Sequence, residues 1–192
     1  MREEDIASLI RALADADETC REDSATAIFR AGSELVAPVL REWLANPESA
    51  GQILVREAVA QIVVGLAVQR SRFDLIRTAN GSPRLADVPP DQDAREFELD
   101  FGRGVRLDIL TSRDPQGSGA IARYLQKFGE GIQQIEIEVR DVGRATETFR
   151  SRFGLQPVYA ATRAGANATR VNFFLVPVPG GRKILIELVQ EQ

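Results

Sequence analysis

The first third of the chain places apolar residues at helical spacing. Six of them recur at i, i+1, i+4, i+5, i+8 and i+9, which predicts one face of an α-helix: Leu35, Val36, Val39, Leu40, Trp43 and Leu44. Ser33 is a candidate N-cap, and Asn46-Pro47 is a stop signal. A shorter helix is predicted upstream, with Cys20, Ala25, Ile28 and Phe29 on it and Gly32 at its end.

From residue 60 the pattern changes to strands. The apolar run from Ile62 to Val68 predicts the first strand of a module that continues as helix 71–81 and strands 82–88, 95–101 and 105–111. The second half repeats this order as strand 134–139, helix 144–154 and strands 155–162, 169–176 and 183–189. This repeated order indicates an internal duplication of a unit of about 55 to 60 residues. We therefore predict an α+β fold of tandem βαβββ modules, preceded by a small all-α helical extension.

Charge supports a division of the chain. Residues 1–59 hold 6 Arg against 12 Asp and Glu, whereas residues 60–192 hold 18 basic against 16 acidic side chains. The predicted domains are a helical extension at 1–58 and a domain at 59–192, with module one at 60–112, a linker helix at 113–130 and module two at 131–192. The stretch from Asp15 to Leu44 resembles a HEAT-type repeat of two antiparallel helices. Because repeat proteins need about three units for stability, these helices must pack on the following domain or on a partner chain.

Composition excludes several classes of chemistry. The chain has no histidine, which removes Ser-His-Asp and Cys-His catalysis, HExxH zinc sites and any histidine base. The single cysteine, Cys20, permits no internal disulfide. The net charge is -4 and the chain has no run of basic residues, so the sequence gives no indication that the protein binds nucleic acid. No apolar run approaches the ~20 residues that cross a bilayer, and the N-terminus is acidic, so we expect a cytoplasmic protein with no membrane partner.

Three segments carry a resemblance to a known family. AIARYLQKFGEGIQQIEIEVRDV spans the module junction and TRVNFFLVPVPGGRKILIELVQ lies at the C-terminus, with PPDQDAREFEL as a third match. They resemble the vicinal oxygen chelate superfamily, which includes glyoxalase I, extradiol dioxygenases and bleomycin-resistance proteins. Within it the strongest resemblance is to the methylmalonyl-CoA epimerases. It implies a cleft formed by the two modules and a divalent metal bound by residues from the first and fourth strand of each.

The resemblance also implies the positions of the ligands. Val63 stands where the epimerases have a histidine, and Asp108 where they have Gln or Glu. Gln134 stands at the second histidine, and Glu187 matches the family's glutamate. The implied metal ligands are thus Asp108, Gln134 and Glu187, and an oxygen-only set favours a hard ion, Mg²⁺, Mn²⁺ or else Co²⁺, over Zn²⁺.

Strand alternation groups further acidic side chains with these positions. If each polar face looks into the cleft, seven carboxylates converge there: Glu96, Glu98, Asp100, Asp108, Glu136, Glu138 and Glu187. Unpaired carboxylates at this density raise one another's pKa values. A cation should therefore neutralise them, whether Arg106 and other arginines, a metal ion or a positively charged ligand.

These residues predict an enzyme or a binding protein. The resemblance makes Glu96 a proton-transfer base and lets Glu187 serve as the second, in an isomerase or lyase that acts on a small acyl or carbonyl substrate. The alternative is a metal-free, bleomycin-resistance-like module that binds a small molecule in the acid-rich cleft. A third hypothesis is an accessory subunit whose residues 1–58 dock on a protein partner. The superfamily resemblance also implies a homodimer.

Overall fold

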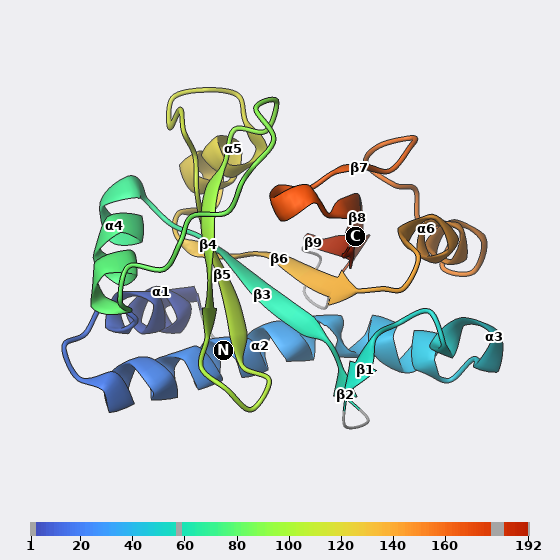
Figure 1. Cartoon of the computed structure of the whole chain (residues 1–192), viewed down its shortest axis with the longest axis horizontal. Coiled ribbons are helices and arrows are strands. Elements are labelled where there is room, and N and C mark those ends of the chain that lie inside the picture. Colours follow the sequence, from blue (N-terminus) through green and yellow to red (C-terminus); the bar gives the residue numbers. More distant parts are fainter. Residues whose placement is uncertain (1–2, 57–58, 178–182, 192) are drawn as a thin grey trace. The chain divides into compact units, whose positions relative to one another are not determined.

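The computed structural model describes residues 3–56, 59–177 and 183–191 (Figure 1). The chain forms two compact units, one from residues 1–32 and 63–133, the other from 33–62 and 134–192. The divisions fall inside helix α2 (Glu18–Leu44) and strands β3 (Ile62–Ala67) and β6 (Gly131–Glu138). The boundary expected between residues 58 and 59 touches positions outside the described residues, and the predicted domain limits stay predictions.

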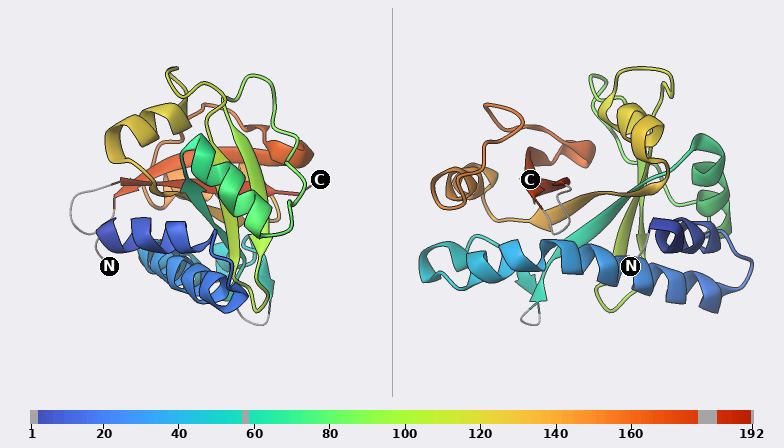
Figure 2. Two further views of the ribbon diagram at one scale, coloured as in Figure 1. Left: turned by 90° about the vertical axis from the view of Figure 1, so that its left-hand side faces the viewer. Right: turned by 180° about the vertical axis from the view of Figure 1, so that it is seen from behind.

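The first unit holds a three-stranded sheet in the order β4-β5-β3. Strand β4 (Arg95–Asp100) runs antiparallel to β5 (Arg106–Thr111), and β3 runs parallel to β5. Helix α4 (Arg70–Ala79) lies across the β4–β5 hairpin (Figure 2), where the Phe73 ring meets the Phe97 ring edge-on with centroids 4.7 Å apart. Helices α1 (Glu3–Ala12) and α5 (Ala120–Phe128) and the part of α2 up to Gly32 also belong to this unit.

The second unit holds strands in the order β6-β9-β8-β7. Strand β9 (Lys183–Gln190) runs parallel to β6 and antiparallel to β8 (Arg170–Pro177), and β7 (Arg163–Ala164) pairs with the start of β8. Helix α6 (Val142–Ser151) packs on β8 and β9, with Phe149 centred 4.7 Å from Phe174 and 4.9 Å from Trp43 of α2. Four short elements complete it: α3 (Pro47–Ala50), β1 (Val55–Arg56), β2 (Val59–Ala60) and η1 (Ala166–Ala168).

Both units repeat one strand pattern, which confirms the predicted duplication and the α+β class. In each, the first strand runs parallel to the last, and the last runs antiparallel to the strand before it. The predicted strands at 82–88 and 155–162 are wrong. Pro83 and Pro157 lack an N–H group for a ladder, so these segments keep isolated contacts, such as the bridge between Pro157 and Phe174.

The two-helix hairpin expected before residue 45 is also wrong, because α2 runs unbroken for 27 residues through Gly32 and Pro38. Ala25, Ile28, Val36 and Trp43 are all buried at helical spacing on both sides of Gly32, so one stripe continues through the glycine. This stripe of α2 is therefore buried within the chain itself, whereas Leu44 at the end of the helix is 37% exposed. No helix in the described part of the chain, α2 included, is long and apolar enough to cross a membrane.

Candidate functional site

Glu96 is a partly buried carboxyl on β4 of the first unit. Its neighbours Arg95 and Phe97 point to the opposite face, where the Arg95 guanidinium lies 5.6 Å from the Phe73 ring centroid. Burial raises the pKa of the Glu96 carboxyl to about 7, and the charge of Arg113 opposes part of that rise. A carboxyl that is half ionised near neutral pH can both accept and return a proton.

Arg113, which sequence reasoning missed, is held in place from both sides. Asp93 accepts a hydrogen bond from the Ser112 hydroxyl at 2.5 Å and another from the Asp114 backbone N–H at 2.9 Å. The Arg113 Nη2 atom donates to the Val88 carbonyl at 3.3 Å. This clamp fixes the guanidinium that modulates Glu96. The only signal in the sequence was the Ser-Arg-Asp triplet directly after the last strand of module one.

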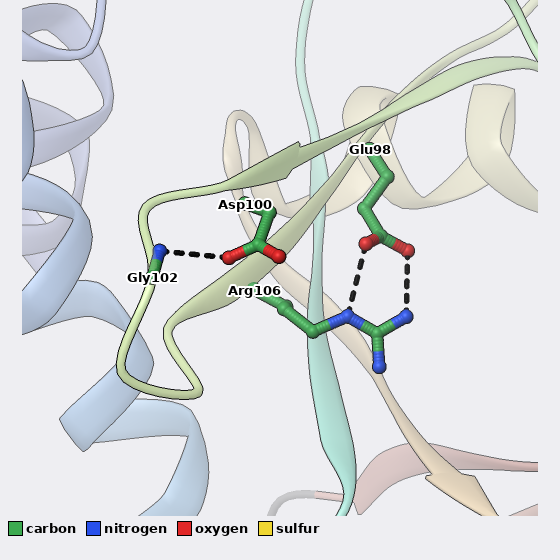
Figure 3. Close-up of polar contacts among 4 residues, drawn as sticks. All are labelled: Glu98, Asp100, Gly102 and Arg106. Carbon is green, nitrogen blue, oxygen red and sulfur yellow. Dashed lines mark hydrogen bonds and ion pairs between the residues drawn. The ribbon is translucent and has the colours of Figure 1, made fainter.

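Asp108 lies on β5 opposite Glu98 and is buried. Beside it, the Arg106 guanidinium makes two parallel bonds to the Glu98 carboxylate, Nε to Oε1 at 2.9 Å and Nη2 to Oε2 at 3.0 Å (Figure 3). Asp100 accepts a hydrogen bond from the Gly102 N–H at 2.7 Å at the hairpin turn. Arg106 thus neutralises the charge of Glu98 as expected, and Asp100 stabilises the turn between β4 and β5.

In the second unit the structure brings two predicted ligands together. The Gln134 Nε2 atom donates to Glu187 Oε2 at 2.8 Å and to Glu136 Oε1 at 3.2 Å. Gln134 and Glu187 are both buried, and Glu136 and Glu187 are paired across β6 and β9. The amide therefore stands between two carboxylates, where its N–H groups offset part of their repulsion.

The position implied for a first metal ligand is occupied by a buried valine. Val63 precedes Gly65 by two residues, and Gly65 lies opposite Asp108, so the valine shares that strand face. A valine side chain offers no donor atom. This position therefore contributes no ligand, as the valine in the sequence implies.

The remaining donors suit a hard cation by their chemistry. Within residues 3–56, 59–177 and 183–191, no three His, Cys, Asp or Glu side chains gather closely enough to hold a metal ion. The Gln134 amide, which lies within hydrogen-bond distance of the Glu136 and Glu187 carboxylates, carries a further oxygen donor. Amide and carboxylate oxygens are the ligands that Mg²⁺ and Mn²⁺ prefer.

Comparisons with known proteins address the fold and the family. No protein-family model and no curated protein sequence matches this chain. Methylmalonyl-CoA epimerase from Mycobacterium tuberculosis is 30% identical with a TM-score of 0.57, over 74% of this chain and 95% of that chain. A hypothetical protein from Bacillus halodurans C-125 is 24% identical with a TM-score of 0.55, over 68% of this chain and 92% of that chain.

A third solved structure is a variant of the Streptomyces coelicolor epimerase in complex with 2-nitronate-propionyl-CoA. It is 22% identical with a TM-score of 0.53, over 69% of this chain and 97% of that chain, and it supports the fold alone. The duplicated strand order and the Mycobacterium match together show that this chain belongs to the vicinal oxygen chelate superfamily. Within that superfamily it resembles the methylmalonyl-CoA epimerases, as the junction and C-terminal segments predicted.

The individual site residues stay predictions in their roles. Glu96 and Asp108 lie on adjacent strands of the first unit, and Gln134 and Glu187 meet in the second. The homodimer and a protein partner for residues 1–58 also stay predictions.

Proposed function

We propose that the protein is an isomerase or lyase of the epimerase type, which moves a proton at the carbon next to the carbonyl of a small acyl thioester. The observation that carries this proposal is Glu96, a carboxyl whose pKa burial raises to about 7. The family fold supports it.

In this reaction the Glu96 carboxylate takes the α-proton. The electrons of the C–H bond form the carbon–carbon double bond of an enolate, and the carbonyl electrons move onto oxygen. Return of a proton to the opposite face, by Glu187 as the second acid-base group, gives the epimer. A divalent metal held by Gln134 and Glu187 with Asp108 would supply an electrophile for the enolate oxygen.

Burial suits Glu96 to this role for a physical reason. A carboxylate with an ordinary pKa near 4.5 is a weak base toward an acidic C–H group. Raising the pKa toward neutrality strengthens the base while about half of it stays ionised at pH 7. The Arg113 charge limits the rise, which keeps the ionised form accessible.

The test is α-proton exchange. The full chain is incubated in D₂O at pH 8 with methylmalonyl-CoA and other small acyl-CoA thioesters, and deuterium uptake is followed by mass spectrometry. Glu96→Gln should lower the exchange rate by about 10² to 10⁴-fold, the range of general acid-base catalysis. Glu98→Gln is the matched control, since Glu98 lies two residues away on the same strand and binds Arg106. It should change the rate less than about threefold, the change expected from losing one exposed ion pair.

Parallel incubations with a chelator and with Mn²⁺ test the metal, and elemental analysis of protein purified without chelator provides a readout independent of activity. The proposal is refuted if no thioester exchanges under any of these conditions, or if Glu96→Gln exchanges at the wild-type rate.

A second function is favoured by Val63 and by the hydrogen bond from Gln134 to Glu187. These features suit a metal-free binding module of the bleomycin-resistance type, in which the carboxylates meet a cationic ligand. Thermal-shift measurements separate the two functions. Stabilisation by cationic small molecules, with none by thioesters or divalent ions, would favour the binding module.

A further inference from the structure

The sheet face of the second unit that carries Gln134 and Glu187 continues into apolar residues. Phe173 lies opposite Glu187 on the neighbouring strand, and Leu175 lies opposite Leu185. Directly paired residues share a face, so Phe173 and Leu175 extend from the carboxylate pair toward the end of β8. The opposite face carries Phe174 and packs on α6.

Two residues of the adjacent loop join this face. The Val158 N–H donates to the Phe173 carbonyl at 2.7 Å, which ties the loop to the sheet. The Tyr159 ring meets the Phe173 ring edge-on with centroids 6.0 Å apart, and the Arg163 guanidinium lies 4.4 Å above the tyrosine ring. We call Val158, Tyr159, Phe173 and Leu175 the apolar strip.

Three side chains of the apolar strip are exposed to solvent beside a buried carboxylate. Leu175 is 50% exposed, Val158 49% and Tyr159 38%. Exposed apolar groups that adjoin a site with polar groups mark a ligand surface. Three half-exposed side chains are too few for a stable dimer interface, which buries about 800 Å² per partner.

We propose that the apolar strip binds the hydrocarbon chain of an acyl substrate, with the thioester at Glu187 and the chain along Phe173 and Leu175. This inference rests on the proposed function, and it names the substrate class as thioesters with an apolar acyl chain. The register between β8 and β9 supports this position of the acyl chain, because it places Phe173 directly opposite Glu187.

The experiment measures dissociation constants by calorimetry for propionyl-, butyryl-, hexanoyl- and octanoyl-CoA with the full chain. Each added methylene should tighten binding about two- to fourfold, since burying one CH₂ contributes up to about 0.8 kcal/mol. Leu175→Ser should flatten this dependence. Leu75→Ser is the control, because Leu75 is 55% exposed on α4 of the first unit. Phe173→Ala provides a second variant.

Three outcomes overturn the inference: affinity independent of chain length, an unchanged slope in Leu175→Ser and Phe173→Ala, or a dimer that Leu175→Ser dissociates in light scattering. The last result would assign the strip to a second copy of the chain. Chain-length dependence without proton exchange would refute the proposed function alone. Exchange with a flat affinity series would refute this inference alone.

Discussion

Replacing Glu96 by glutamine tests the buried carboxyl without any substrate. Below pH 4.5 the group is protonated in the folded and unfolded chains alike, and its ionisation contributes nothing to the free energy of unfolding. Between pH 4.5 and about 7 the unfolded chain releases the proton while the folded chain keeps it. Stability therefore falls as the pH rises through this window and stays lowered above it.

The size of the effect follows from the width of the window. A rise from 4.5 to about 7 corresponds to roughly 3 kcal/mol, at 1.36 kcal/mol per pH unit. Glutamine does not titrate. Relative to wild type, Glu96→Gln should therefore gain up to ~3 kcal/mol of stability on going from pH 4.5 to pH 8.

The assay is urea unfolding of wild type and variant at pH 4.5, 6 and 8, followed by circular dichroism. Glu98→Gln is again the control. It loses an ion pair with Arg106 and should be less stable than wild type at pH 8 by up to about 1 kcal/mol, a change of opposite sign. A difference between Glu96→Gln and wild type that stays constant to within ~0.5 kcal/mol across this range would refute the reasoning.

Two further predictions concern the surroundings of the site and the core. Arg113→Met removes the charge that lowers the pKa of Glu96, so the pKa should rise further and the acid limb of the exchange rate should move to higher pH; an unmoved limb contradicts the assigned role. Phe149→Ala removes the ring shared by Trp43, Phe153 and Phe174 and should cost about 3 to 5 kcal/mol, measured by urea unfolding with Trp43 fluorescence. A loss below ~1 kcal/mol would contradict that packing.

Strands β4 and β6 could be predicted because their buried and polar positions alternate. Phe97 and Leu99 are buried between polar residues on β4, and Ile135 and Ile137 are buried between polar residues on β6. A period of two decides which side chains of one strand share a face, so the grouping of Gln134 with Glu136 was accessible from the pattern, whereas the pairing of Glu136 with Glu187 depends on the register between strands.

The failures have local causes. Gly32 and Pro38 favour the end of a helix when only nearby residues are considered. The buried stripe of α2 nevertheless continues past both. The segments 82–88 and 155–162 were predicted as strands from their place between turn residues and from the repeated order of the two modules. They lack the ladder because proline removes an N–H group and because strand pairing is decided by partners distant in sequence.

The perturbed pKa of Glu96 was beyond reach of the sequence, since it depends on desolvation and on a guanidinium 17 residues along the chain. This pKa bears on how a chain without histidine could transfer a proton at neutral pH. A chain without histidine lacks the side chain that ordinarily titrates near pH 6.5. Burying a glutamate raises its pKa to about 7, the range that imidazole would occupy. The proposed proton transfer at neutral pH therefore needs no histidine, and Glu96, the carboxyl with this pKa, stands at the position that the resemblance to the epimerases implies for a base.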